Sequence, residues 1–408
     1  MNLRLSAALA LILLLPVPAS AYSVLAHEAV IDATWEASIR PILAARFPAS
    51  EAELRKARAF AYGGCLIQDL GFYPFSSRFF GNLTHYVRSG DFVEALLREA
   101  QTGPELAFAL GALAHVAADT RGHALAVNRA VPLIYPKLRA KSGDEITYEE
   151  HPAAHLKTEF GFDVLQVARG RYAPDAFHDF IGFEVARDLL ARAFRATYAL
   201  EIDDVFGNLG LAIGTFRWTV SGTIPEVTKV AWETRRKEID ALSPGGTREA
   251  FLFASSRADF ERRWGTEYKR PGFMQRVVSW ILRIVPRVGP FRALAYRTPT
   301  PEAERLFLDS FNRSVERYRA LLQSQAAGTM SLDNRNLDTG DPVTSGQYRL
   351  ADETYAELLE RLGKDEFRTV TASLRVDLLR FFAPLKTAAR TDTRSRKTLA
   401  LLAALERR

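Results

Sequence analysis

Residues that could bind a metal ion recur at a spacing of four in the segment 114–123. If the apolar run before this segment continues as a helix, His115, Asp119 and His123 stand at i, i+4 and i+8, and their side chains line one face. A second pair with the same spacing, His155 and Glu159, follows about thirty residues later. Neutral imidazole and carboxylate are the ligands expected for catalytic zinc where no thiolate is available, so the spacing predicts a metal site.

The distribution of histidines supports this prediction. All seven lie in the first 178 residues, at positions 27, 85, 115, 123, 151, 155 and 178. A single histidine on a helix is more often a surface or capping residue than a ligand. Here, however, His27 and His85 accompany the two spaced clusters, together with Asp69. The apolar surroundings of Asp119 would also make its burial costly without a cation. We therefore expect a metal site that includes no residue beyond His178, and we assign His151 and His178 to the surface.

The chain has one cysteine, Cys65, which excludes an intramolecular disulfide framework and any cysteine-based zinc cluster. We expect this thiol to be buried as a small apolar residue. Helical periodicity recurs while the Val/Ile/Thr alternation of strands is scarce, so we predict an all-α fold. The expected helices span 53–62, 92–101, 104–128, 155–169, 177–200, 224–242, 302–327 and 352–362 with a continuation past Glu366.

The N-terminus has the features of a secretory signal peptide: Arg4, an apolar run over 7–15 and the small-residue sequence Ala19-Ser20-Ala21. The alternative is a membrane anchor, but the apolar run is well short of the roughly 20 residues that span a bilayer. We therefore predict cleavage after residue 21 and a secreted or periplasmic protein. A turn at 243–246 and a polar surface loop at 328–346 then divide the chain into a catalytic domain, 22–242, and a helical C-terminal extension, 243–408.

With these residues identified, the chain resembles the bacterial zinc-dependent phospholipase C family and the single-strand-specific zinc nucleases related to it. The resemblance covers roughly 22–165 and includes an N-terminal aromatic residue followed by a histidine, with Asp69 and His85 in loops. Its motifs are His115-x3-Asp119-x3-His123 and Ala154-His155-x3-Glu159-Phe160-Gly161-x-Asp163-Val164-Leu165. The fold that it implies is the helical domain of this superfamily, here with a helical C-terminal extension. We expect the residues beyond His178 to cover and present the site.

The resemblance implies three zinc ions. The first would be bound by Asp69, His85, His115 and Asp119, and the second by His123, His155 and Glu159. The third would be bound by His27, Asp119 and the amino terminus and carbonyl of Tyr22. It also implies that Asp69 accepts a proton from the attacking water and that Asp119 bridges two ions. The family usually has tryptophan where this chain has Tyr22. Because the chelating atoms belong to the backbone, zinc binding should survive this difference.

The substrate class is less well defined by the sequence. Phe72, Tyr73 and Phe75 follow Asp69 and could line a substrate pocket, holding a quaternary ammonium group or stacking on a base, or they could pack in the core. The segment 269–297 combines seven basic residues with apolar ones. It is either a peripheral membrane contact or a core helix with arginines at its margins. The net charge of +6 falls to about +5 without Arg4, which by itself indicates no nucleic-acid partner.

Three functions therefore remain open. The first is an exported zinc-dependent phosphodiesterase that hydrolyses a phospholipid or related phosphoester. The second is a single-strand nuclease or 3′-nucleotidase on the same scaffold, with nucleic acid as the substrate. The third is a helical protein whose zinc sites are structural and not catalytic. The sequence predicts no oligomeric state.

Overall fold

The computed structural model describes residues 23–169, 171, 183–220, 296–387 and 393–408, and this part of the chain is helical, without a β-strand. The predicted all-α fold is confirmed. The predicted helices that lie in these ranges form with slightly different bounds, among them α4 (Glu51–Gly64), α6 (Ser89–Glu99), α10 (Pro152–Ala168), α17 (Pro301–Ala326) and α18 (Arg349–Lys364). The helix expected at 224–242 and the start of that expected at 177–200 lie outside the described residues.

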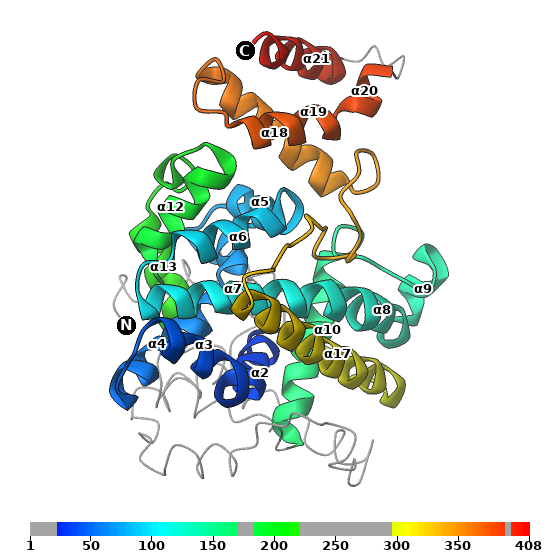
Figure 1. The fold of residues 1–408 in the computed structure, drawn as a ribbon. Helices are drawn as coiled ribbons and strands as arrows, with labels where there is room; N and C mark the ends of the chain where they lie inside the picture. Colours follow the sequence, from blue (N-terminus) through cyan, green and yellow to red (C-terminus); the bar gives the residue numbers. More distant parts are fainter. Residues whose placement is uncertain (1–22, 170, 172–182, 221–295, 388–392) are drawn as a thin grey trace, which may run out of the picture.

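Helix α7 (Gly103–Gly122) runs through the centre of the molecule (Figure 1). Its first turn is closed by the Thr102 side chain, which accepts a hydrogen bond from the backbone N–H of Glu105. Nearly all of the later side chains of α7 are buried, on every face of the helix. A helix that is apolar all round needs neighbours on all sides. These are mainly α4, α6, α17 and α2 (Val24–Thr34).

Helices α4 and α7 lie unusually close together because glycines face the contact. A Cβ atom on Gly64 would lie 1.9 Å from the carbonyl oxygen of Phe108, and one on Gly111 would lie 2.2 Å from that of Ala61. Only glycine allows two backbones to approach in this way. The capping box of α4, formed by Ser50 and Glu53, defines where that helix begins. The side chains that follow Gly64 are thereby brought beside the middle of α7.

The remaining helices surround this core. They are α3 (Arg40–Arg46), which follows the π-helical turn η1 (Trp35–Ile39), and α5 (Arg78–Tyr86), α8 (Asn128–Ile134), α9 (Pro136–Ser142), α12 (Arg187–Tyr198) and α13 (Leu209–Trp218). Helix α12 packs on α6, and α13 packs on the 3-10 turn η2 (Gln68–Phe72). The thiol of Cys65 is fully buried in this core, as expected.

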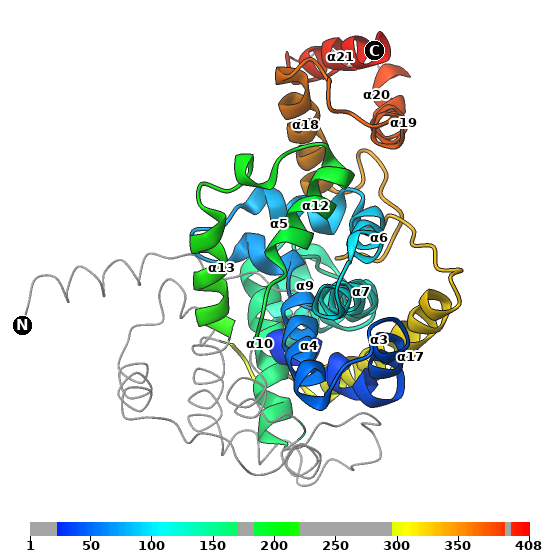
Figure 2. The ribbon, with the colours of Figure 1, turned by 60° about the vertical axis from the view of Figure 1, so that its left-hand side comes forward.

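The C-terminal helices α18, α19 (Ala372–Phe381), α20 (Ala383–Thr387) and α21 (Thr393–Glu406) project from one end of the molecule (Figure 2). Helix α18 packs against both α5 and α21. Its Tyr355 ring stacks on Phe381 with centroids 3.6 Å apart, and its hydroxyl donates to Asp377. The chain between α17 and α18 crosses back over α7 (Figure 1).

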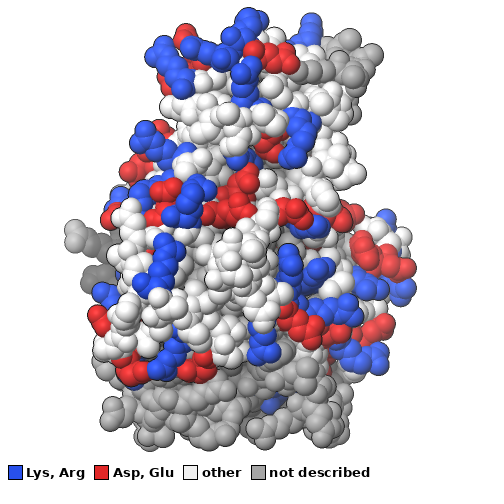
Figure 3. All heavy atoms as spheres, in the orientation of Figure 1, with Lys and Arg blue, Asp and Glu red and all other residues white. Residues whose placement is uncertain are grey.

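Acidic and basic side chains alternate over the face shown in Figure 3. No helix within the described ranges is long and apolar enough to cross a membrane. Several predictions fall outside these ranges: the signal peptide 1–21, the boundary at 243 and positions 269–295 of the predicted membrane contact. Of that contact, Arg297 is described. Its guanidinium donates to the carbonyl of Ile134 and lies over the ring of Tyr135, so it packs against α8.

Candidate metal centre

Helix α7 supplies the centre of the site. One turn separates His115 from Asp119, and His115 Nε2 lies 2.9 Å from Asp119 Oδ2. The other ring nitrogen of His115, Nδ1, donates to the carbonyl of Cys65 at 2.9 Å, which fixes the tautomer and turns Nε2 toward Asp119. Both side chains are fully buried. The close packing of α4 on α7 is therefore what orients the first imidazole.

At His123 the α-helix passes into a π-helical turn, η3 (His123–Val127), in which the backbone N–H of Asn128 donates to the carbonyl of His123. Such wide turns occur frequently at functional sites. The His123 ring stays on the same side as Asp119, with 4.0 Å between Nε2 and Oδ2. The predicted alignment of His115, Asp119 and His123 on one face is thus present in the structure.

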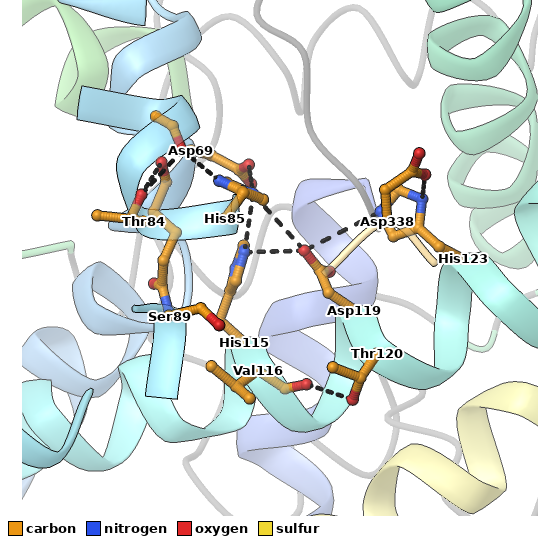
Figure 4. A network of polar contacts seen from close by, with 12 residues as sticks. Asp69, Thr84, His85, Ser89, His115, Val116, Asp119, Thr120, His123 and Asp338 are labelled. Atoms are coloured by element: carbon orange, nitrogen blue, oxygen red, sulfur yellow. Dashed lines mark hydrogen bonds and ion pairs between the residues drawn. The ribbon is translucent and has the colours of Figure 1, made fainter. Parts of the chain in front are cut away.

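Asp69 and His85 reach the site from η2 and α5. His85 lies near the end of a helix and not in a loop as expected, and its Nδ1 donates to the carbonyl of Gly81 at 2.8 Å. Its Nε2 then faces the centre, 3.4 Å from Asp69 Oδ1 and 3.7 Å from Asp119 Oδ2. The distance to His115 Nε2 is also 3.4 Å. The structure brings these four predicted ligands together (Figure 4).

His27 reaches Asp119 from α2. Its Nε2 lies 3.2 Å from Asp119 Oδ1, and its ring stacks on His115 with centroids 4.4 Å apart. The start of α2 is held by Asp163, which accepts a hydrogen bond from the backbone N–H of Leu25 at 2.9 Å. Asp119 Oδ1 thus faces His27, while Oδ2 faces His115. Tyr22 lies outside the described residues.

Helix α10 contributes His155 and Glu159. His155 Nε2 lies 2.8 Å from His123 Nδ1 and 3.0 Å from Glu159 Oε1. Glu159 is 3 % exposed and His155 is fully buried. His151, assigned to the surface, is half-buried and caps α10, accepting a hydrogen bond from the backbone N–H of Ala154. His178 lies outside the described residues.

The expectation that no residue beyond His178 belongs to the site is wrong. Asp338, in the segment between α17 and α18, is 2 % exposed, and its Oδ1 lies 2.9 Å from His123 Nδ1 (Figure 4). The segment 328–346, expected to be a surface loop, is buried at its centre, from Asn336 to Asp338. Tertiary contacts with α7, α8 and the chain before α10 place it there, and none of them leaves a local pattern in the sequence.

The arrangement fits divalent zinc. Ligand-type atoms fall into three buried groups, each within 4.8 Å: His27, Asp69 and His115; His85, His115 and Asp119; His123, His155 and Glu159. A tetrahedral zinc ion with bonds of about 2.0–2.1 Å places neighbouring ligand atoms about 3.3 Å apart, close to the separations observed. In addition, Glu159 Oε1 is buried and accepts no hydrogen bond from the described residues. A bound cation would satisfy this oxygen.

The electrostatics of the site also favour cations. Burial lowers the pKa of His115, but Asp119 and Asp69 outweigh it and raise that pKa to about 9. Burial raises the pKa of Glu159 well above its usual value, and the negative charges of Asp69 and Asp119 add to this effect. Burial lowers the pKa of His155 to about 3, so this imidazole is neutral and able to bind metal. Buried negative charge thus accumulates around the neutral imidazole of His155, and a bound cation would stabilise it.

Aromatic side chains border the site on one side. The ring of Phe72 lies 5.4 Å from that of His85 and 6.2 Å from that of Tyr148, and Tyr148 lies edge-on to His155. Sequence reasoning missed Tyr148, which stands between elements and has no periodic neighbours. We call Phe72 and Tyr148 the aromatic wall. Both rings are half-buried.

The other two aromatic residues expected at the pocket behave differently. Tyr73 is 2 % exposed and packs edge-on against Phe216 of α13, so the structure corrects its assignment from pocket wall to core. Phe75 is 49 % exposed and has a positive φ of 61°. A role for Phe75 in substrate binding stays a prediction.

Comparison with known proteins agrees with this geometry. The model of the zinc dependent phospholipase C family matches residues 26–208. None of the curated proteins and none of the solved structures compared with the chain matches it. The matched segment contains every predicted ligand except Tyr22, and it ends before Asp338. The segment 26–208 therefore belongs to the zinc dependent phospholipase C family.

Proposed function

We propose that the protein is an exported phosphoric ester hydrolase that uses zinc to hydrolyse phospholipids in the manner of a phospholipase C. The observation that carries the proposal is the presence of three buried groups of histidine and carboxylate side chains within the segment that matches the family. The exported location is inferred from the N-terminal sequence. It would also free the Tyr22 amino group as a ligand.

We infer three zinc ions. Asp69, His85, His115 and Asp119 would hold one, His123, His155 and Glu159 the second, and His27, Asp119 and the Tyr22 amino terminus the third. Bound zinc would supply activation of water and neutralisation of charge on the phosphate group. Two distances support the sharing of the Asp119 carboxylate by two ions. Oδ1 lies 3.2 Å from His27 Nε2, and Oδ2 lies 2.9 Å from His115 Nε2.

Residues of the chain would perform the remaining tasks. Asp69, which is fully buried beside His85, would accept a proton from the attacking water. The aromatic wall would shield the reacting phosphate from bulk water and contact the headgroup. Burial raises the pKa of Tyr148 to about 12, and the positive charge of Arg78 opposes this shift. The guanidinium of Arg78 therefore lies near the aromatic wall. A guanidinium there suits an anionic phosphodiester.

The test is turnover of phosphatidylcholine vesicles by protein whose N-terminus is verified as Tyr22. We expect release of phosphocholine and diacylglycerol that stops with a chelator and returns with zinc. Single-stranded DNA and a 3′-nucleotide are assayed in parallel, because cleavage of these alone would favour a nuclease on the same scaffold. Zinc-loaded protein that is inert on all substrates would favour a non-catalytic zinc protein.

A matched pair of variants on α10 separates loss of the site from loss of the helix. His155→Ala removes a proposed ligand of the second ion, so it should weaken one zinc equivalent and reduce turnover. His151→Ala removes only the cap of the same helix, at a cost of about 1 kcal/mol of stability, and should retain turnover. Equal loss in both variants would argue against the assigned ligand.

A further inference from the structure

The position of Asp338 has a consequence for the second zinc site. Its carboxylate comes from a part of the chain that the family match does not reach. Oδ1 lies 2.9 Å from His123 Nδ1 and 3.7 Å from His155 Nε2. These are the two imidazoles that, with Glu159, form one of the three buried ligand groups. The carboxylate oxygen therefore faces the two imidazoles of this group.

The second oxygen of Asp338 is already held by two donors. Oδ2 accepts hydrogen bonds from the backbone N–H of Tyr148 at 3.0 Å and from the hydroxyl of Tyr348 at 2.7 Å. These contacts fix the rotation of the carboxylate, so Oδ1 is directed at the imidazoles. Ligating carboxylates in metal sites are commonly oriented in this way.

The backbone around Asp338 is docked just as firmly. The Leu337 N–H donates to the carbonyl of His85 at 3.1 Å, and the Asn128 side chain donates to the carbonyl of Asp338 at 2.8 Å. Gly340, at φ 75°, lies so close to α7 that a Cβ atom would stand 2.7 Å from the carbonyl oxygen of Thr120. A short segment, 336–340, is thus fitted between the ends of α5 and α7. We call it the docking segment.

We propose that Asp338 Oδ1 is the fourth protein ligand of the zinc ion bound by His123, His155 and Glu159. The separations from Oδ1 to the two imidazole nitrogens lie on either side of the value of about 3.3 Å expected between neighbouring ligands of tetrahedral zinc. Four protein ligands are typical of structural zinc, whereas catalytic sites keep one position open for water. This ion therefore holds the docking segment to the helical core, and activation of water belongs to the ions around Asp119.

The proposal rests on the metal centre assigned above and does not depend on catalytic activity. It is tested on the full mature protein by zinc titration against a chromophoric chelator, without substrate. Asp338→Asn and Asp338→Ala should each weaken one zinc equivalent by about 100-fold and leave the others unchanged. The control is Asp341→Asn, the same substitution at an exposed position of the neighbouring chain, which should change nothing.

Two outcomes of this titration would overturn the proposal. The first is unchanged affinity for every zinc equivalent in both variants of Asp338. The second is a large loss of zinc affinity in Asp338→Ala together with an affinity in Asp338→Asn that stays within a few-fold of the wild type. An amide oxygen can still accept a hydrogen bond from His123 but is a poor zinc ligand. Asp338 would then position His123 without binding metal. A wild-type protein that binds zinc as described but hydrolyses nothing would refute the proposed function and leave this proposal intact.

A measurement on the unaltered protein covers the case in which neither variant folds. Hydrogen exchange of the backbone amides in the docking segment is followed with zinc and after its removal. We expect exchange at least tenfold faster without zinc in this segment, and a smaller change in α19, which is distant in the fold (Figure 1). Equal exchange in the docking segment in both states would overturn the proposal.

Discussion

Replacing Asp119 with asparagine tests whether one carboxylate serves two ions. The substitution keeps the shape of the side chain and removes its charge. Oδ1 faces His27 at 3.2 Å and Oδ2 faces His115 at 2.9 Å, so both the ion at His27 and the ion at His115 should lose a ligand. The variant should therefore weaken two zinc equivalents, in contrast to the single equivalent expected for Asp338→Asn.

The size of the effect follows from the affinities. Mutating residues that merely support metal ligands costs about 10–100-fold in affinity, so removal of a ligand should cost at least 100-fold at each ion. At saturating zinc this corresponds to about 2.7 kcal/mol of folding stability per ion, or about 5.5 kcal/mol for two. For a chain of this size we expect the zinc-loaded protein to unfold about 10 °C below the wild type.

The assay combines zinc titration with thermal unfolding, with zinc and with chelator. Asp377→Asn is the control, because Asp377 is a buried carboxylate that bonds Tyr355 far from the site. Its effect on stability should be the same with and without zinc. If Asp119→Asn weakens only one equivalent, or lowers stability equally in both conditions, the shared carboxylate is refuted.

Further predictions concern the support of the site. Gly340→Ala should destabilise the protein by about 2 kcal/mol or more in urea unfolding. The control is Gly346→Ala, which should cost only about 1–2 kcal/mol because Gly346 also has a positive φ but has open space around it. Equal costs would argue against close docking at Gly340. Asp163→Ala leaves the buried N–H of Leu25 without its acceptor and should cost about 1–3 kcal/mol, with weaker zinc binding in the same titration; an unchanged N-terminal zinc equivalent would contradict this link. In the metal-free protein, burial lowers the pKa of His115, but Asp119 and Asp69 outweigh burial and raise this pKa to about 9. Protonation of His115 should therefore stabilise the folded protein fully below about pH 6.5, and this stabilisation should be lost as the pH rises through 9. Because zinc must displace this proton, apparent zinc affinity should rise between pH 6 and 9, and a flat or falling profile in chelator competition would contradict the assignment.

The parts of the site that follow helical spacing could be predicted from the sequence. His115 and Asp119 are one turn apart on α7, and His155 and Glu159 are one turn apart on α10, so local geometry alone directs each pair to one face. The burial of these helices also follows from their apolar composition. What the pattern could not provide is the distance between the two helices.

Asp338 shows why the rest could not be predicted. Apart from Leu337, its neighbours are Asn, Arg, Thr, Gly and Asp, a composition typical of surface loops. Its position is fixed by hydrogen bonds of Leu337 to His85 and of Asp338 to Asn128 and Tyr148, and these partners are all distant in the sequence. The sequence also could not show which of the adjacent aromatic residues Phe72 and Tyr73 lines the site. Phe72, in the 3-10 turn η2, faces the site, while Tyr73, just after the turn, faces the core. That difference depends on the turn and not on residue type.

The most direct test of the account is restoration of activity to metal-free protein by stepwise addition of zinc. The N-terminus is verified as Tyr22, and hydrolysis of phosphatidylcholine vesicles is measured at each zinc equivalent. We predict no turnover without zinc and full turnover only when the ions around Asp119 are bound. Turnover that persists in the metal-free protein, or none when every site is filled, would contradict a zinc-dependent phospholipase.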